Sequence, residues 1–249
     1  MANEDVRIRL QALGFAEREA QTLADHFLDA ERRGKKGHGV ARVAWLETQE
    51  IDPVAEPERL YADEGFERWD GSGALGYLTL AEICVAQIES PPAHARVVVA
   101  SNCFPTGMLG HYTRKVADAG LVSALTATSP ARLAHPDGGP PLAGTNPISI
   151  AVPSSDQGPI VVDVSMGQVT YGDVIAGLAS EEELVPFGGD RRHKAFALAL
   201  GLQLLVDSLA GEGHGAVMLV GRPEADPVPA LRQVAAGLRL PGDGPLGAD

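Results

Sequence analysis

The 249-residue sequence has little cysteine, no long apolar run and no basic excess, and each shortage excludes a class of protein. Two cysteines, Cys84 and Cys103, cannot form a disulfide framework, and no CxxC or Cys/His cluster predicts a zinc site. No apolar run reaches the ~18–20 residues of a membrane-spanning helix. The charged segment MANEDVRIRL is unlike a signal peptide. We therefore expect no membrane partner and a cytoplasmic location.

The charge balance excludes a further class of partner. The net charge is −13, from 33 acidic and 20 basic residues. An acidic surface repels nucleic acids and anionic membranes, so neither is expected as the main partner. A local basic patch could still bind a small anionic ligand.

Familiar enzyme motifs are also missing. The sequence has no GxGxxG after a strand pattern and no GxxxxGK[ST], which are the usual nucleotide-binding loops. It has neither the GxSxG of many hydrolases nor the HExxH of many zinc proteases. Any nucleotide site must therefore be built in another way.

Strand and helix patterns alternate along the chain, which predicts an α/β layered fold. The predicted strands cover residues 66–69, 96–100, 121–127, 148–152, 160–164 and 216–220. The predicted helices cover residues 3–13, 16–33, 40–49, 78–88, 108–119, 167–179, 194–209 and 228–238. Residues 51–65 are expected to be an extended connector and residues 130–141 a Pro/Gly-rich loop.

The same patterns predict three regions. Residues 1–60 form an N-terminal helical region, and residues 61–220 form an α/β region that binds ligand or cofactor. Residues 221–249 form a short C-terminal segment whose tail, GDGPLGAD, is expected to be disordered.

A histidine between two glycines is the first candidate site, in Gly37-His38-Gly39-Val40. The open backbone lets the side chain approach a ligand, and histidine can move a proton near neutral pH. Arg42 follows and could clamp a carboxylate with two parallel hydrogen bonds. The alternative is a solvated loop histidine beside a basic turn.

Two further segments place polar side chains next to predicted strands. Thr145 and Asn146, in Gly144-Thr145-Asn146-Pro147, could present hydroxyl and amide groups to a ligand, or could form an ordinary turn. Asp163 and Ser165 end a predicted strand, where ligands collect in α/β sheets. The alternative for Ser165 is that it caps the helix that follows.

A cluster of cationic residues precedes the most apolar predicted helix. It contains Arg191, Arg192, His193 and Lys194. Cations are disfavoured at a helix N-terminus, so the cluster indicates an anionic ligand such as a nucleotide phosphate. The alternative is a solvated loop.

Taken in order, these motifs resemble one family, the type-2 malate/L-lactate dehydrogenases. The matching segments are GHGVAR, RWDGSGALGYLTL, VVVASNCFPTGMLGHYTRKVADAG, GTNP, VVDVSMGQVTYG, PFGG, HKAFALAL and GHGAVMLV. The resemblance implies a three-layer α/β/α fold with a mixed sheet that binds NADPH or NADH without a Rossmann motif, usually as a homodimer. It also implies hydride transfer involving a small carboxylated substrate, which is a 2-keto or 2-hydroxy acid or a cyclic imino acid.

The resemblance also assigns roles to residues and implies no metal. His38 would be the general acid/base. Arg42, Thr145 and Asn146 would bind the substrate. The residues that would bind the cofactor are Asp163, Ser165, Arg191, His193 and Lys194, and the cations among them slightly favour NADPH over NADH.

The chain departs from the family pattern at several positions. The family serine before the histidine is Gly37, a second family histidine aligns with Pro105, and a Thr-Asn pair becomes Ala127-Thr128. Few residues separate Leu178 from Pro186, where the family has a covering loop, and the C-terminal helices are nearly gone.

These departures leave two other functions open. The chain could be a cofactor-independent lyase, cyclase or isomerase that uses His38 as a base, or a non-catalytic homologue that binds a metabolite or a partner. Loss of the C-terminal helices predicts an uncovered apolar face on the N-terminal helices, which would form the homodimer contact.

Overall fold

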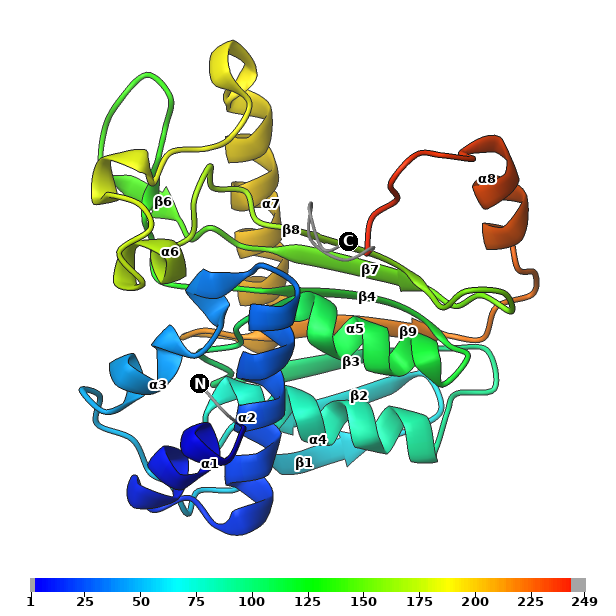
Figure 1. The fold of residues 1–249 in the computed structure, drawn as a ribbon, viewed down its shortest axis with the longest axis horizontal. Coiled ribbons are helices and arrows are strands. Elements are labelled where there is room, and N and C mark those ends of the chain that lie inside the picture. Colours follow the sequence, from blue (N-terminus) through cyan, green and yellow to red (C-terminus); the bar gives the residue numbers. More distant parts are fainter. Residues whose placement is uncertain (1–2, 243–249) are drawn as a thin grey trace.

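A seven-stranded mixed sheet lies at the centre of the computed structural model, which describes residues 3–242 (Figure 1). The strands are β1 (Glu58–Ala62), β2 (Phe66–Asp70), β3 (Ala95–Ser101), β4 (Val122–Ala127), β7 (Ile148–Val152), β8 (Ile160–Val164) and β9 (Ala216–Gly221). Their order is β1-β2-β3-β9-β4-β7-β8. β2 and β3 run parallel, and the other neighbours run antiparallel.

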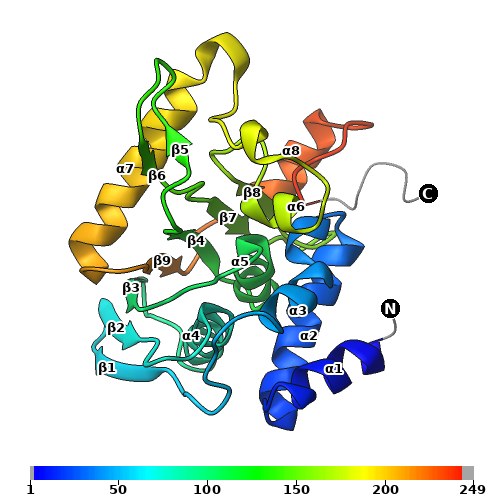
Figure 2. The same ribbon diagram turned by 90° about the vertical axis from the view of Figure 1, so that its left-hand side faces the viewer.

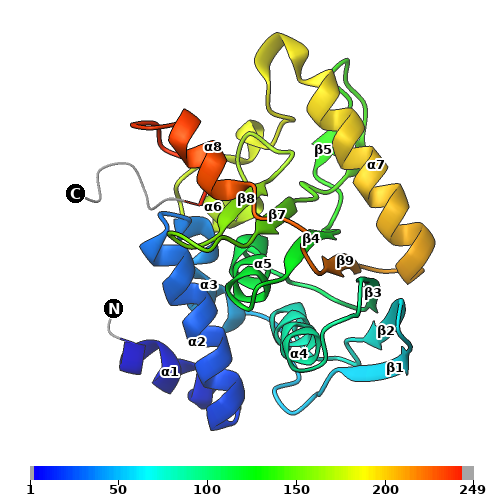
Figure 3. The ribbon, with the colours of Figure 1, turned by 90° about the vertical axis from the view of Figure 1, so that its right-hand side faces the viewer.

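Helices cover both faces of this sheet, and the expected α/β/α layering is confirmed. The helices are α1 (Asn3–Ala12), α2 (Glu17–Arg32), α3 (Ala41–Leu46), α4 (Gly76–Glu89), α5 (Leu109–Asp118), α6 (Tyr171–Ile175), α7 (His193–Ala210) and α8 (Val228–Val234). Figures 2 and 3 show α4 and α5 against one face, with α2 outside them, and α7 against the other.

The alternation of side chains along β3 explains why both faces are covered. Val98 and Ala100 belong to the core that packs under α4 and α5. Val97 and Val99 point the other way and pack with Val206 of α7. Successive residues of a strand face opposite sides, so a strand that is apolar at every position needs a layer on each face. Full burial of such a side chain contributes about 1.5–3 kcal/mol.

The prediction of an uncovered apolar face on the N-terminal helices is wrong. Val6, Leu10, Leu23 and Phe27 are fully buried. They share a core with residues of α3 and α4, which cover the apolar stripe of α1 and α2. The N-terminal helices are therefore packed within this chain.

An exposed apolar face lies instead on α7. One side of this helix packs against the sheet through Ala199 and Val206, while Leu198, Leu204 and Leu205 are 46–58% exposed. By length and composition alone, α7 is the one helix within residues 3–242 that could cross a membrane. In the fold it packs on β3, β4 and β9.

Several elements differ from the sequence-based expectations. The helix expected over 167–179 is only α6, because Thr170 and Asp173 form a capping box that starts it late. The connector 51–65 contains β1, all of whose residues are exposed, so no apolar alternation marked it. The loop 130–141 contributes to a two-stranded sheet of β5 (Leu133–Ala134) and β6 (Pro141–Ala143).

Most of the tail expected to be disordered, residues 243–249, lies outside the described residues. Gly242 is described and lies against β8, next to Pro241, whose carbonyl accepts a hydrogen bond from the N–H of Val161 at 3.2 Å. Three short 3-10 helices complete the described elements: η1 (Lys36–His38), η2 (Glu181–Glu183) and η3 (Gly189–Arg191).

Candidate active site

The site lies at the edge of the sheet where β3, β4 and β8 end and β7 begins. The antiparallel pairs β3/β9, β9/β4, β4/β7 and β7/β8 bring these four strand ends to one edge. Loops from this edge line one wall of the site, and η1, α3 and α6 line the other. Figure 1 shows α3 and α6 at the same end of the molecule, and the two helices contact each other. Strand ends of this kind are common ligand sites in α/β proteins.

The first cavity, of about 390 Å³, contains His38 and Arg42, and its size suits a small organic ligand. Its other lining residues are Trp45, Gln49, Phe104, Pro105, Thr106, Gly107, Thr128, Ser129, Pro130, Arg132, Thr145, Pro147, Thr170, Tyr171 and Gly172.

Arg42 is a buried cation with unused hydrogen-bond donors. It lies on α3, is 7% exposed, and its guanidinium packs 4.7 Å from the centre of the Trp45 ring. Within the described residues, its Nε and Nη1 atoms are buried without a hydrogen-bond partner. A buried charge is costly unless an opposite charge or an acceptor meets it. Arg42 is therefore arranged to receive an anionic group such as a carboxylate.

His38 is the last residue of η1, and its side chain lines the first cavity. The pKa of His38 is lowered from 6.5 to about 3, mainly by burial and also by the charges of Arg42 and Lys35, while the charge of Asp173 acts in the opposite direction. Its Nδ1 atom is buried, and no group in residues 3–242 bonds to it. The free protein therefore holds His38 as a neutral imidazole at pH 7.

A glycine-to-glycine contact fixes the position of His38 and accounts for one departure from the family pattern. A Cβ atom at Gly37 would lie 2.6 Å from the backbone nitrogen of Asp173 and 2.7 Å from the carbonyl carbon of Gly172. A Cβ atom at Gly172 would likewise lie 2.9 Å from the carbonyl carbon of Gly37. The serine of the family pattern would not fit here, because α6 packs directly on the backbone of η1.

Two more cavities adjoin the first. A second cavity, of about 310 Å³, shares with it His38, Gly107, Thr145, Pro147 and Thr170. A third, of about 270 Å³, shares with the second Lys35, Met108, Asp163 and Val164. The three make an elongated groove with His38 at the junction of the first two and Lys35 at the junction of the last two.

Asp163 and Ser165 both line this groove. A carboxylate oxygen of Asp163 accepts a hydrogen bond from the N–H of Gly110 at 3.1 Å, at the start of α5. Burial raises the pKa of Asp163, and the charge of Lys35 opposes this. The Ser165 hydroxyl accepts a hydrogen bond from the N–H of Gly167 at 3.1 Å. No helix begins at Ser165, so the reading of this residue as a helix cap is wrong.

The structure separates the two polar residues of the GTNP motif. Thr145 lines the first and second cavities. Asn146 is fully buried and lines none of the three cavities. Its amide donates to the carbonyl of Ala199 and to Oε1 of Gln203, each at 2.9 Å, and its Oδ1 accepts from the N–H of Ser129 at 3.3 Å. Asn146 ties the motif to α7, and the structure does not place it at the predicted substrate site.

The structure does not bring the cationic cluster to His38. Arg191, His193 and Lys194 are exposed at η3 and the start of α7, and they line none of the three adjoining cavities. Arg192 and His193 line a separate surface hollow of about 570 Å³, which shares Gln168 with the second cavity. Their predicted contact with the cofactor stays a prediction.

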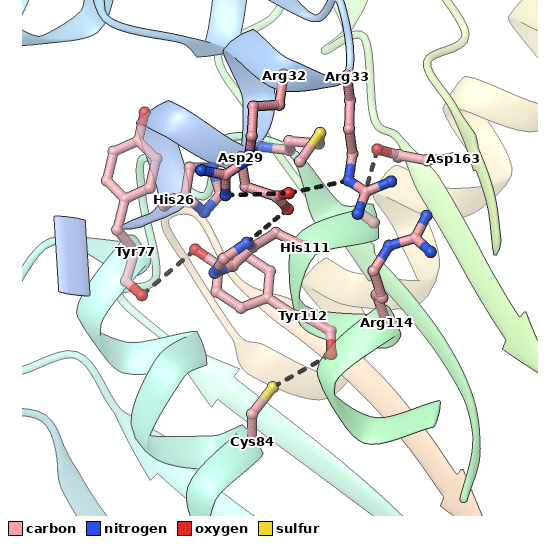
Figure 4. Close-up of polar contacts among 12 residues, drawn as sticks. His26, Asp29, Arg32, Arg33, Tyr77, Cys84, His111, Tyr112, Arg114 and Asp163 are labelled. Carbon is pink, nitrogen blue, oxygen red and sulfur yellow. Dashed lines mark hydrogen bonds and ion pairs between the residues drawn. The ribbon is translucent and has the colours of Figure 1, made fainter. Parts of the chain in front are cut away.

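A buried network of polar groups supports this wall of the groove (Figure 4). The Asp29 carboxylate accepts hydrogen bonds from Nδ1 of His111 and Nε of Arg33, each at 3.0 Å. Burial works against the charged form of Asp29, but the His111 bond and the Arg33 charge outweigh it and lower the pKa of Asp29 to about 2. Burial lowers the pKa of His111, so this histidine donates as a neutral ring.

The same network holds the segment that follows β3. Nε2 of His26 accepts a hydrogen bond from the N–H of Met108 at 3.0 Å. The Tyr112 hydroxyl donates to the carbonyl of Thr106 at 3.1 Å (Figure 4 shows the ring). Gly107 between them has φ +68°, and a Cβ atom there would overlap His26 and Tyr77. These contacts therefore fix the loop whose residues Pro105 and Thr106 line the first cavity.

Sequence reasoning missed three cavity residues, which are Lys35, Arg132 and Tyr171. The basic turn at 32–39 was a usable signal for Lys35. Arg132 is an isolated cation in a Pro/Gly-rich segment, and Tyr171 begins a five-residue helix. Nothing in their spacing indicates that they face His38.

Both cysteines are free and buried, and burial raises the pKa of each thiol to about 12. The prediction that Cys103 is a buried thiol is confirmed, and neither cysteine lines the groove. Within residues 3–242, no group of three or more His, Cys, Asp or Glu could hold a metal ion.

Comparison with known proteins agrees with this geometry. The family model for malate/L-lactate dehydrogenase matches residues 3–184. The chain is 31% identical over 237 residues to a Delta(1)-pyrroline-2-carboxylate/Delta(1)-piperideine-2-carboxylate reductase of Pseudomonas putida, covering 82% of this chain and 67% of the relative. It is 29% identical over 179 residues to a (2R)-3-sulfolactate dehydrogenase (NADP(+)) of Chromohalobacter salexigens, covering 70% of this chain and 54% of the relative.

A solved structure has the same fold. The malate dehydrogenase of Entamoeba histolytica superposes with a TM-score of 0.83 at 19% sequence identity, and the match covers 97% of this chain and 85% of that chain. The chain therefore spans between about half and two thirds of the length of the two sequence relatives and 85% of the chain of this structural neighbour.

Proposed function

Because the chain belongs to the malate/L-lactate dehydrogenase family, we propose that it is an NAD(P)H-dependent reductase of a small 2-keto acid or cyclic imino acid. One observation carries the proposal. His38 lies where a cavity with the buried, unpaired Arg42 meets an elongated groove. Such a junction holds a small carboxylated substrate on one side of the histidine and a cofactor on the other.

The residues of the groove fit NADPH or NADH. The second and third cavities adjoin His38 and extend away from it, and Lys35 provides a cation for a phosphate between them. Asp163 and Ser165 line the same groove and would contact the cofactor. The bound cofactor would supply the hydride to the substrate carbon. The chain itself supplies binding, orientation and the proton.

Substrate binding and proton transfer are linked through Arg42. Its guanidinium, which lines the first cavity, would donate to the substrate carboxylate. The charge of Arg42 is one of the causes that lower the pKa of His38, so neutralising it raises this pKa when the substrate binds. His38 then accepts a proton in the complex and gives it to the carbonyl oxygen or imine nitrogen as the hydride reaches the carbon. Asp173 favours the protonated ring.

The test is consumption of NADPH or NADH in the presence of 2-keto acids and a cyclic imino acid. We expect turnover by the wild type and a loss of about 10²-fold or more in kcat for His38→Gln, with the cofactor still bound. Equal turnover by His38→Gln, or no turnover with either nicotinamide, would overturn the proposal. Activity without nicotinamide that is lost in His38→Gln would identify a cofactor-independent lyase or isomerase instead.

We also propose a homodimer and a cytoplasmic location. The exposed leucines of α7 are the apolar surface that supports a contact between copies. The two free cysteines support a reducing compartment.

A further inference from the structure

The first cavity contains a second arginine that the proposed reaction does not use. Arg132 lines this cavity together with Arg42, and none of the lining residues is Asp or Glu. The chain as a whole has a net charge of −13, with 33 acidic and 20 basic residues. Arg42 and Arg132 therefore give the cavity two positive charges and no internal counter-charge.

The backbone holds Arg132 firmly at the cavity. Its N–H donates to the carbonyl of Ala143 at 2.8 Å, next to the pairing of β5 with β6. The next residue, Leu133, is fully buried in a small core that includes Ala199 of α7. The backbone of Arg132 is therefore held in place, and its side chain lines the cavity beside Tyr171 of α6.

The guanidinium of Arg132 is supported on its face and available at its edge. It packs 3.4 Å from the centre of the Tyr171 ring of α6. Stacking on a ring uses the flat face of a guanidinium and leaves its N–H groups pointing outward in the plane. No oxygen atom in residues 3–242 accepts a hydrogen bond from this side chain. The edge is thus free to form paired bonds with an acidic group.

Arg42 and Arg132 share this construction. Each has an aromatic ring on its face, Trp45 for Arg42 and Tyr171 for Arg132, and two buried N–H groups of Arg42 have no partner in the described chain. Two like charges in one partly buried cavity repel each other unless anions meet both. A ligand with a single carboxylate satisfies only one of them.

We propose that the substrate carries two acidic groups. The carboxylate next to the reacting carbon binds Arg42, and a second anionic group, carboxylate or sulfonate, at the other end of a short chain binds Arg132. This rests on the proposed function and narrows it to 2-keto acids with a second anionic end. Cyclic imino acids with one carboxylate would then be poor substrates.

The experiment is a calorimetric titration of the full chain with and without NADP⁺. The probes are L-malate, 3-sulfolactate and L-lactate, which share the hydroxy acid end and differ in the second anionic group. We expect the wild type to bind malate or sulfolactate about 10- to 100-fold tighter than lactate, the range for a charged hydrogen-bonded pair. If malate binds more tightly than sulfolactate, the second anionic group is a carboxylate, and if sulfolactate binds more tightly, it is a sulfonate.

Variants of Arg132 separate its charge from its packing. Arg132→Met should lower the affinity for the dianion to that for lactate and leave the lactate affinity unchanged. Arg132→Lys should restore part of the preference. The matched control is Arg59→Met on exposed β1, where the guanidinium also packs on an aromatic ring, 5.6 Å from the centre of Trp69, and does not line the cavity.

Equal binding of all three acids by the wild type, no binding of any of them in both titrations, or an equal loss for all three in Arg132→Met would overturn the inference. Its failure is distinct from failure of the proposed function. A reductase that turns over single-carboxylate acids contradicts only the second anionic group. Dianion binding dependent on Arg132, without consumption of any nicotinamide, contradicts only the redox reaction.

Discussion

At the scale of single residues, the chemistry rests on charges that the fold leaves uncompensated. Arg42 and His38 belong to the same short segment, yet one is a buried cation with free donors and the other a neutral ring. The charge of Arg42 is one of the causes that lower the pKa of His38, after burial. In the proposed reaction, a carboxylate bound to Arg42 would remove part of this lowering.

The pH dependence of stability follows from His38. Its pKa is about 3 in the folded protein and 6.5 when exposed, so the unfolded chain binds the proton more tightly. Stability is therefore lost as the pH falls from about 6.5 towards 3. Between pH 7 and 5 the His38 contribution falls by about 2 kcal/mol.

Urea unfolding at both pH values checks this prediction. His38→Gln should reduce the loss of unfolding free energy between pH 7 and 5 by that amount. Part of the loss should remain in the variant, because burial also lowers the pKa of His26 and His111. An unchanged loss in His38→Gln would show that His38 is not held neutral by the fold.

Lys35 provides the second residue-scale prediction. Both Lys35 and its neighbour Lys36 are exposed, but Lys35 lines the second and third cavities and Lys36 lines neither. Lys35→Gln should weaken NADPH binding about tenfold, the cost of one charge-assisted contact, and Lys36→Gln should not. Lys194→Gln tests the sequence-based expectation for the cationic cluster in the same titration. A loss of NADPH affinity in Lys194→Gln and none in Lys35→Gln would indicate that the cofactor does not bind in the groove.

Residues at the site could be predicted where the pattern that marks them lies within one short segment of the sequence. His38 and Arg42 were found because the open Gly-His-Gly turn and the spacing to an arginine are features of one segment. Asn146 was assigned to the substrate because turn residues are commonly exposed, but its contacts to α7 come from residues more than fifty positions away. Arg132 was missed because its partner Tyr171 is also remote in the sequence.

At the scale of elements, the placement of η1 against α6 decides the shape of the site. The two meet backbone to backbone because both contribute a glycine, Gly37 and Gly172. Asp173 is thereby brought close enough to act on His38. The five-residue α6 covers this side of the cavity although few residues separate Leu178 from Pro186.

This contact predicts the effect of restoring the family serine. Gly37→Ser should destabilise the protein by about 1–3 kcal/mol and lower its melting temperature, because α6 must move away from η1. Gly65→Ser is the matched control, since a Cβ atom there meets nothing within 4 Å. Equal melting temperatures for the two variants would mean that α6 can move away from η1 without a loss of stability.

Elements with strong apolar patterns were predicted well, and those without them were not. The strands β3, β4, β7, β8 and β9 lie within one or two residues of the expected ranges. The edge strand β1 has no buried residue, so it carries no alternation to detect. The start of α6 depends on a capping box rather than on apolar spacing.

At the scale of the whole molecule, the fold leaves an apolar surface exposed on α7. The leucines that do not face the sheet, including Leu198, Leu204 and Leu205, are exposed along one side of the helix. The sequence suggested a contact on the N-terminal helices, but α3 and α4 bury that face. We therefore place the proposed self-association surface on α7, on the opposite face of the sheet from the N-terminal helices (Figure 3).

We expect a dimer in sedimentation experiments at micromolar concentration, and Leu204→Glu together with Leu205→Glu should convert it to a monomer. Introducing charge into an apolar contact removes its main driving force. The control is Leu60→Glu on exposed β1, which should leave the dimer intact. A wild type that sediments as a monomer, or a dimer unaffected by the α7 changes, would contradict this assignment.

Binding of a reduced nicotinamide to the wild type is the measurement that tests the account most directly. Calorimetric titration with NADPH and with NADH should give a dissociation constant in the micromolar range for at least one of them, which is usual for a cofactor held by several polar contacts. Absence of binding for both at millimolar concentration would contradict the account, because the groove beside His38 would then not be a cofactor site.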